Sequence, residues 1–275
     1  YDAQKGSITS CDGETPDWKI TGNDVKVTIE GYGFAKDTVF WARDVPALYS
    51  PFLIFPVKTQ RQSGLLIPEI SSSDRLGYVY DQPFFWAISP SSDATLYAGF
   101  LSDRGARIGG EFRYVTDALS RGIWQLDYLS DDKIDDGTSA TRDYRFDSTP
   151  QRTNTDRFWL RMKSDQALPH DFFAKLDVDV VSDPDYLLEF KDTLSGYDSS
   201  NQIFSNELGR DLDEYDDKIR QNSLIIYRSW PEFFLSLQTE WNDNVVARRT
   251  GAQDTTLQTL PSVEFDSTRI QLGST

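Results

Sequence analysis

Basic side chains alternate with apolar side chains in two stretches of the chain. The basic residues are Arg107, Arg113, Arg157, Arg161 and Lys163. Every second side chain of a β-strand points to the same face of its sheet, so these cations are expected to share a face. On that face they can contact the phosphate groups of a ligand, or they can pair with the carboxylates of Asp127, Asp177 and Asp179. The sequence leaves both interpretations open.

Hydrolytic chemistry has little support in this sequence. Serine hydrolases use a histidine as general base, and His170 is the single histidine. It lies in the short segment QALPHDFF, where a solvated or capping turn residue is expected. Asp and Glu are so abundant that any pair suited to glycoside hydrolysis is uninformative. We therefore predict that the protein is not an enzyme.

The composition narrows the possible ligands. A formal charge of −16 argues against nucleic acid, which requires clustered Lys and Arg. Cys11 is the single cysteine, so this chain forms no internal disulfide and no multi-cysteine zinc site. The acidic runs at 131–136 and 211–217 lack EF-hand spacing and are predicted to be solvated loops. No metal and no cofactor are expected.

Short strand-like runs occupy residues 1 to about 60, at 18–21, 25–35 and 38–45 among others. Gly and Asp clusters separate them, as in β-sandwiches and jelly rolls. These runs are too few to close such a domain, so we expect its C-terminal part here, followed by a linker shaped by Pro46, Pro51 and Pro56.

A cleaner two-residue period begins after residue 61. It predicts strands at 63–70, 77–88, 93–101, 106–116, 121–130, 154–165, 171–181, 219–228, 231–241 and 258–266. Tight turns alternate with long polar segments at 131–153, 182–218 and 242–257, a pattern typical of outer-membrane barrels. The sequence contains no run of about 18 apolar residues, so no membrane-spanning helix is predicted. The predicted fold class is all-β, with antiparallel strands.

An open sheet edge is not viable in lipid, because every backbone donor there needs a partner. We therefore expect further strands outside this chain. A sequence that starts at Tyr1 without a signal peptide agrees with that expectation.

Six segments carry a resemblance to a known family. They are WARDVPALYSPFLIFPV (41–57), RQSGLLIP (61–68), PFFWAISPSSDATL (83–96), RGARIGGEFRY (104–114), LDYLSDD (126–132) and VSDPDYL (181–187). In order and spacing they are similar to the LptD family of outer-membrane lipopolysaccharide-assembly proteins.

The resemblance implies an architecture and a set of partners. Residues 1–60 are expected to be the end of a periplasmic β-jelly roll, and residues 61–275 the first strands of a transmembrane barrel of about 26 strands. The implied function is lipopolysaccharide transport into the outer leaflet of a Gram-negative outer membrane through a lateral gate. The implied partners are lipopolysaccharide, the membrane lipid, the lipoprotein plug LptE and the jelly-roll bridge protein LptA. A general porin or solute channel is the alternative.

The resemblance also implies roles for individual residues. Pro68 and Pro83 would interrupt the first two barrel strands beside the lateral gate, because proline cannot donate to a sheet ladder. Cys11 would form a disulfide with a cysteine outside this chain. The five cations on the predicted lumen face would contact lipopolysaccharide.

Overall fold

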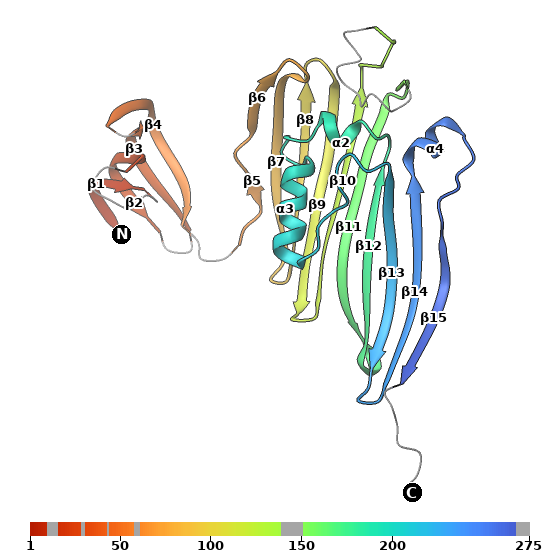
Figure 1. Cartoon of the computed structure of the whole chain (residues 1–275). Helices are drawn as coiled ribbons and strands as arrows, with labels where there is room; N and C mark the ends of the chain where they lie inside the picture. Colours follow the sequence, from red (N-terminus) through yellow and green to blue (C-terminus); the bar gives the residue numbers. More distant parts are fainter. Residues whose placement is uncertain (10–15, 29–30, 43, 58–60, 139–150, 268–275) are drawn as a thin grey trace, which may run out of the picture. The chain divides into compact units, whose positions relative to one another are not determined.

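The computed structural model describes residues 1–9, 16–28, 31–42, 44–57, 61–138 and 151–267. Over these residues the chain is mostly antiparallel β-structure, which confirms the predicted all-β class (Figure 1). It divides into two compact units, residues 1–62 and 63–275. Among the described residues, no helix is long and apolar enough to cross a membrane.

The first unit is a four-stranded antiparallel sheet in the order β1-β2-β3-β4. Its strands are β1 (Asp2–Ile8), β2 (Trp18–Val27), β3 (Gly31–Ala42) and β4 (Val45–Val57). β3 runs through Asp37, whose φ of 46° shifts the side-chain alternation so that Ala35 and Thr38 are both buried. The predicted runs at 25–35 and 38–45 are therefore wrong about where strands begin and end.

The proline-rich stretch that was predicted to be a linker is a strand. β4 pairs with β3 over its whole length and contains Pro46, Pro51 and Pro56. Within the described residues it is an edge strand, and proline is tolerated where the outward N–H groups have no ladder partner. The linker prediction is wrong for this reason.

The second unit is one antiparallel sheet of eleven strands among the described residues. Its strands are β5 (Gly64–Leu65), β6 (Glu69–Ser73), β7 (Gly77–Ser89), β8 (Ser92–Leu101), β9 (Gly105–Asp117), β10 (Ser120–Asp131), β11 (Asp156–Leu168), β12 (Phe172–Val181), β13 (Ile219–Ser229), β14 (Phe233–Asn244) and β15 (Thr259–Ser267). All ten strands predicted after residue 61 are present, and the first of them is divided into β5 and β6. The sheet is open, with β5 and β6 at one edge and β15 at the other.

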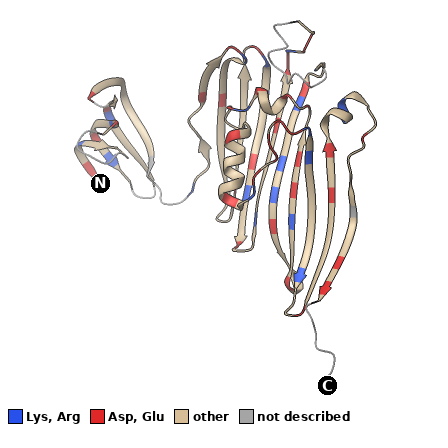
Figure 2. Cartoon of the chain, in the orientation of Figure 1, with Lys and Arg blue, Asp and Glu red and all other residues tan. Residues whose placement is uncertain are grey.

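Alternation within these strands gives the sheet two different faces. The outer face carries exposed apolar side chains, among them Tyr80, Leu96, Phe100, Ile108, Trp124 and Leu126. The inner face carries buried charged side chains, among them Asp81, Arg107, Asp127, Arg157 and Arg161. Figure 2 shows these charges as bands along the central strands. An apolar face on the outside of a sheet is what a lipid-facing wall requires.

The connections differ at the two ends of this sheet. Short turns join β9 to β10 and β13 to β14, and the 3-10 turn Pro169–Asp171 joins β11 to β12. The long connections 132–155, 182–218 and 245–258 all lie at the other end, the last containing α4 (Val245–Thr250) (Figure 1). The predicted alternation of turn and loop lengths is confirmed.

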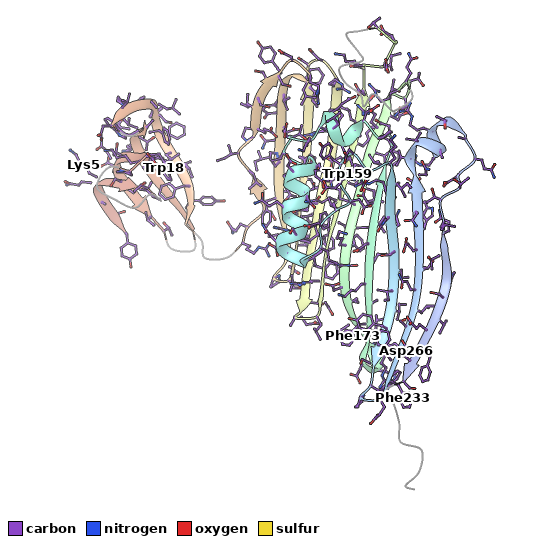
Figure 3. All side chains as sticks on the ribbon, viewed as in Figure 1. Lys5, Trp18, Trp159, Phe173, Phe233 and Asp266 are labelled. Carbon is purple, nitrogen blue, oxygen red and sulfur yellow. The ribbon has the colours of Figure 1, made fainter. Side chains whose placement is uncertain are left out.

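The segment between β12 and β13 folds against the inner face of the sheet. This cover segment, residues 182–218, contains α2 (Tyr186–Glu189) and α3 (Tyr197–Leu208). Phe190 and Phe204 pack into the apolar core around Trp159, a residue of β11 that is labelled in Figure 3. The sequence predicted only a long polar loop here.

Candidate functional site

The first strand of the second unit is interrupted. β5 pairs with β7 through Gly64–Phe85 and Leu65–Phe84, and β6 resumes the pairing at Glu69–Asp81. Residues 66–68 therefore lie opposite only two residues of β7, Gln82 and Pro83, which is the arrangement of a β-bulge. Bulges disturb the ladder locally and weaken the pairing of the strand that contains them.

Both prolines predicted at the gate lie at this interruption. Pro68 is half-buried and precedes β6, while Pro83 is buried within β7, a strand with a neighbour on each side. The carbonyl oxygen of Pro83 accepts a hydrogen bond of 3.0 Å from the N–H of Leu66. Because proline has no N–H, Pro83 cannot donate in return. The structure thus places the two prolines together, and their gating role stays a prediction.

A cavity of about 170 Å³ lies beneath the interruption, between the sheet and the cover segment. Pro83 and Tyr97 line it from the sheet, and Leu194 and Ile203 line it from the cover segment. The cover segment also holds the sheet edge directly, because the backbone N–H of Leu194 donates to the Glu69 carboxylate at 3.2 Å. The edge strand is therefore in contact with the cover segment as well as with β7.

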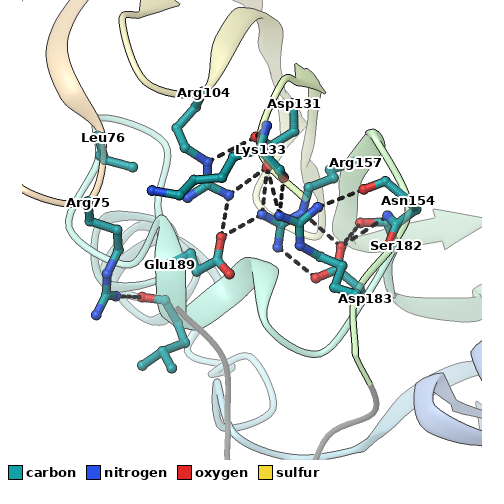
Figure 4. A network of polar contacts seen from close by, with 12 residues as sticks. Arg75, Leu76, Arg104, Asp131, Lys133, Asn154, Arg157, Ser182, Asp183 and Glu189 are labelled. Carbon is teal, nitrogen blue, oxygen red and sulfur yellow. Dashed lines mark hydrogen bonds and ion pairs between the residues drawn. The ribbon is translucent and has the colours of Figure 1, made fainter. Parts of the chain in front are cut away.

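A buried network of ion pairs also holds the cover segment, through Asp183 before α2 and Glu189 at its C-terminal end (Figure 4). Arg157 donates to both carboxylate oxygens of Asp183, Nε at 2.9 Å and Nη2 at 2.6 Å. Its Nη1 contacts Glu189 at 2.6 Å and Asp131 at 3.0 Å. Arg104 contacts the same two carboxylates, with Nε 2.9 Å from Asp131. We call these five residues the Arg157 network.

The Arg157 network joins three parts of the chain. Arg104 precedes β9, Asp131 ends β10 and Arg157 lies near the start of β11, whereas Asp183 and Glu189 belong to the cover segment. All five side chains are at most 2% exposed. The acidic run at 131–136 was predicted to be a solvated loop. That prediction is wrong for Asp131 and Asp135, which are buried, and Arg104 and Arg157 neutralise Asp131 inside the protein.

The buried charges of the Arg157 network are stabilised by one another. Burial alone would raise the pKa of the Asp183 carboxyl, but the positive charge and hydrogen bonds of Arg157 lower that pKa well below its usual value. The Arg157 guanidinium also lies 5.3 Å from the ring of Tyr186 and 5.2 Å from the ring of Phe190. Removing one partner of such a buried pair typically costs about 3–5 kcal/mol, since the other charge is left uncompensated. The network therefore acts as a clamp between the sheet and the cover segment.

Arg161 and Arg107 make similar links farther along the inner face. Arg161 pairs with Asp127 on β10, and its Nη2 donates to the Ser200 hydroxyl of α3 at 2.9 Å. Arg107 pairs with Asp81 on β7 and donates to the Thr193 hydroxyl at 3.0 Å. Each guanidinium thus connects a carboxylate of a nearby strand to a polar atom of the cover segment.

The other two cations predicted as ligand contacts are less enclosed. Arg113 contacts Asp93 at 2.9 Å, and its side chain is 37% exposed. Lys163 contacts Asp177 at 3.4 Å. Every one of the five predicted cations therefore has a carboxylate partner in the structure. Contact with lipopolysaccharide stays a prediction, and Arg113 is the most accessible candidate.

Three further residues complete the account of the predicted sites. Asp179, expected to pair with one of the five cations, pairs with Arg220 and accepts a bond from Trp159 Nε1 at 2.8 Å. His170 is exposed in the 3-10 turn, as expected for a turn residue. Cys11 lies outside the described residues.

The first unit contains a separate apolar groove of about 240 Å³. It is lined on one face of the four-stranded sheet by Ile8, Ile20, Val25, Leu53 and Phe55, among others. A groove with this lining can accept hydrocarbon chains, because it offers apolar surface and few polar partners.

Most of this chain matches one known protein family. A family model described as LptD protein matches residues 34–272, a stretch that contains the interrupted strand and the whole Arg157 network. The chain belongs to the LptD family.

Several curated relatives carry the name LPS-assembly protein LptD. The chain is 33% identical to the relative from Pseudomonas aeruginosa (strain UCBPP-PA14), over 72% of this chain and 20% of that protein. It is 35% identical to the relative from Haemophilus ducreyi, over 68% of this chain and 23% of that protein. It is 29% identical to the relative from Pseudoalteromonas atlantica, over 85% and 30%. The chain thus spans about a fifth to a third of the length of these LptD relatives.

Sequence reasoning missed three members of the network in this LptD-family chain: Arg104, Asp183 and Glu189. A signal was present, because Tyr186 and Phe190 lie four residues apart just after Asp183, which is helical spacing within an otherwise polar segment. Such spacing indicates a helix that packs against something.

Proposed function

We propose that this chain is part of a lipopolysaccharide transporter in the outer membrane of a Gram-negative bacterium. In this proposal residues 1–60 are the periplasmic end of a β-jelly roll, and residues 61–275 begin a transmembrane barrel. Lipopolysaccharide passes from the jelly roll to the outer leaflet through an opening beside the first barrel strand. The apolar outer face of the sheet supports contact with lipid, and the apolar groove of the first unit supports contact with acyl chains.

The observation that carries the proposal is the interruption of the first strand. Between Leu65 and Glu69 the ladder to β7 is irregular: the N–H of Leu66 donates to the Pro83 carbonyl oxygen, but Pro83 has no N–H to donate in return. A net contribution of about 0.5–1.5 kcal/mol per hydrogen bond means that losing a few bonds makes local opening accessible without unfolding the sheet. In lipid each unmade bond costs more, so opening should coincide with entry of the ligand.

The partners in this proposal are those that the family resemblance implies. A jelly-roll bridge protein of the LptA kind would pass lipopolysaccharide to residues 1–60, and a lipoprotein of the LptE kind would fill the barrel lumen. Arg113, the most exposed of the five predicted cations, is the first candidate for contact with lipopolysaccharide phosphates. A general solute channel needs neither an interrupted edge strand nor an attached apolar groove, so these two features favour the transporter.

A crosslink tests the proposal in the full-length protein. Ile67 is 90% exposed within the interruption, so an Ile67→Cys variant can be paired with a cysteine at the facing position of the last barrel strand. Oxidation should stop delivery of lipopolysaccharide to the cell surface while the barrel stays assembled. The matched control is a disulfide in the double variant Leu126→Cys, Leu160→Cys, at registered partners on β10 and β11, which should leave delivery unchanged. Normal delivery with the Ile67 crosslink formed would contradict the proposal.

A further inference from the structure

We infer that Gln82 is the latch of the interrupted strand: its side-chain amide supplies the hydrogen-bond donor that Pro83 lacks. The inference rests on the proposed function, because it assigns to Gln82 control over the opening beside the first strand. The prolines Pro68 and Pro83 alone do not explain why a glutamine lies at position 82.

Gln82 is a polar residue on the apolar outer face. Its neighbours along β7 on that face are Tyr80 and Phe84, which are 47% and 37% exposed, and its registered partner on β8 is Ala98. A primary amide facing hydrocarbon is costly unless its donors and acceptor are satisfied. A glutamine on this face therefore needs hydrogen-bond partners for its amide N–H groups and its amide oxygen.

The Gln82 amide has those bonds, and they close the interruption. Its Nε2 donates to the carbonyl oxygen of Leu66 at 2.9 Å and to that of Pro83 at 3.0 Å. Its Oε1 accepts from the hydroxyl of Tyr80 at 3.1 Å, which fixes the orientation of the amide. In an unbroken antiparallel pair, the residue opposite Leu66 would both accept from its N–H and donate to its carbonyl. Pro83 accepts only, and Gln82 makes the donation instead.

A side-chain donor in place of a backbone donor changes how the edge can open. β5 has two registered pairs with β7, so the bonds of Leu66 are a large part of what holds this segment. Its other nearby support is also a side chain, because the hydroxyl of Ser63 accepts from the N–H of Ala87 at 3.0 Å. A side-chain amide can turn away by rotation about its own bonds, whereas a ladder donor moves only with the backbone. The Gln82 bond is therefore a releasable version of a ladder bond.

Another glutamine in the same sheet provides a matched control. The Nε2 of Gln166 also donates to the carbonyl of the following residue, Ala167, and its Oε1 also accepts from a tyrosine hydroxyl, that of Tyr114. Gln166 lies in the continuous pairing of β11 with β12, one residue beyond the last registered pair of β11 with β10, and Gln82 differs in its additional bond to the carbonyl of the edge strand. The bond to the edge strand is the difference that this control isolates.

The test is a double-variant cycle in the full-length protein with its lipoprotein partner, reconstituted in lipid nanodiscs. Hydrogen exchange is measured for peptides covering residues 61–68. Gln82→Leu should speed exchange at Leu66 by about tenfold, the effect of one hydrogen bond at the upper end of its range. Pro83→Ala restores a backbone donor, so adding Gln82→Leu to that variant should change exchange less than about twofold.

Two further measurements distinguish loss of the Gln82 hydrogen bond from a general loss of structure. The thermal unfolding of the barrel should be the same in Gln82→Leu and wild type, and Gln166→Leu should leave exchange in its own strand unchanged. If Gln82→Leu assembles poorly, Gln82→Asn keeps the amide but is one methylene too short, and it should speed exchange in the same peptides. Unchanged exchange in Gln82→Leu, or an equal increase in both Pro83 backgrounds, would overturn the inference. Failure of the Ile67 crosslink to block delivery would instead overturn the proposed function and leave this exchange result intact.

Discussion

The edge of the sheet at β5, β6 and β7 and the wall at β10, β11 and β12 are built from the same alternating strands but are held by different bonds. In the wall, β10 and β11 pair through ten successive residues from Arg121 to Ser130 without a shift of register. At the edge, two pairs are followed by a break and then by five more. Side chains repair the edge, whereas the Arg157 network reinforces the wall. In the proposed mechanism, the continuous wall stays closed while the interrupted edge opens.

The largest effect is expected from breaking the wall at its centre. Arg157→Met removes the cation that Asp183, Asp131 and Glu189 share, and it should cost about 3–5 kcal/mol because these carboxylates stay buried without full compensation. Protease cleavage within residues 182–218 should rise as the cover segment detaches, and the free energy of unfolding in denaturant should fall. The control is Arg113→Met, a half-exposed cation on the same face, for which a loss below about 1 kcal/mol is expected. Equal losses in the two variants would show that the network is not a clamp.

A smaller effect is expected from placing a charge on the outer face of the wall. Leu126 is 49% exposed there, and an arginine facing the middle of a bilayer costs about 2–4 kcal/mol. Leu126→Arg should therefore lower the stability of the folded protein in lipid vesicles by that amount. A neutral result would contradict the assignment of this face to lipid.

The clamp should also respond to acid. Asp183 has a lowered pKa in the folded protein, so its contribution to stability is complete above the pKa of an unfolded aspartate, near 4, and is lost as pH falls through the lower folded value. The protection of amide hydrogens in the cover segment, measured relative to their intrinsic exchange rate at each pH, should therefore decrease as the pH is lowered below about 4. Asp183→Asn should remove most of this pH dependence, and a variant that keeps the full dependence would assign it to other groups.

The smallest effect is expected at the edge. Pro83→Ala supplies a ladder donor to the strand that lacks one, and it should stabilise the segment around Leu66 by about 0.5–1.5 kcal/mol. Exchange in residues 61–68 should slow, and delivery of lipopolysaccharide should slow with it. Faster delivery in this variant would mean that the missing donor does not limit opening.

The strands of the second unit could be predicted from the sequence because burial on one face imposes a period of two on every strand. Alternation such as that of Arg157, Arg161 and Lys163 with Phe158 and Leu160 marks both the strand and its faces. β4 was missed because proline normally signals a break, and the sequence does not show that a strand lies at an edge. Local patterns describe a strand, not its place in a sheet.

The network could not be predicted because its partners are brought together by tertiary structure. Arg157 and Glu189 are 32 residues apart in the chain, and Arg104 and Glu189 are 85 apart. The sequence placed the cations on one face but gave no register for the cover segment. The pairing of each guanidinium with a particular carboxylate depends on that register.

Hydrogen exchange on the full-length protein in nanodiscs tests most directly whether the edge opens while the wall stays closed. Peptides covering residues 61–68 and peptides covering residues 157–164 are compared in the same sample. The account predicts exchange at least about a hundredfold faster at the edge, since local openings there need few bonds to break. Equal protection of the two segments would contradict it.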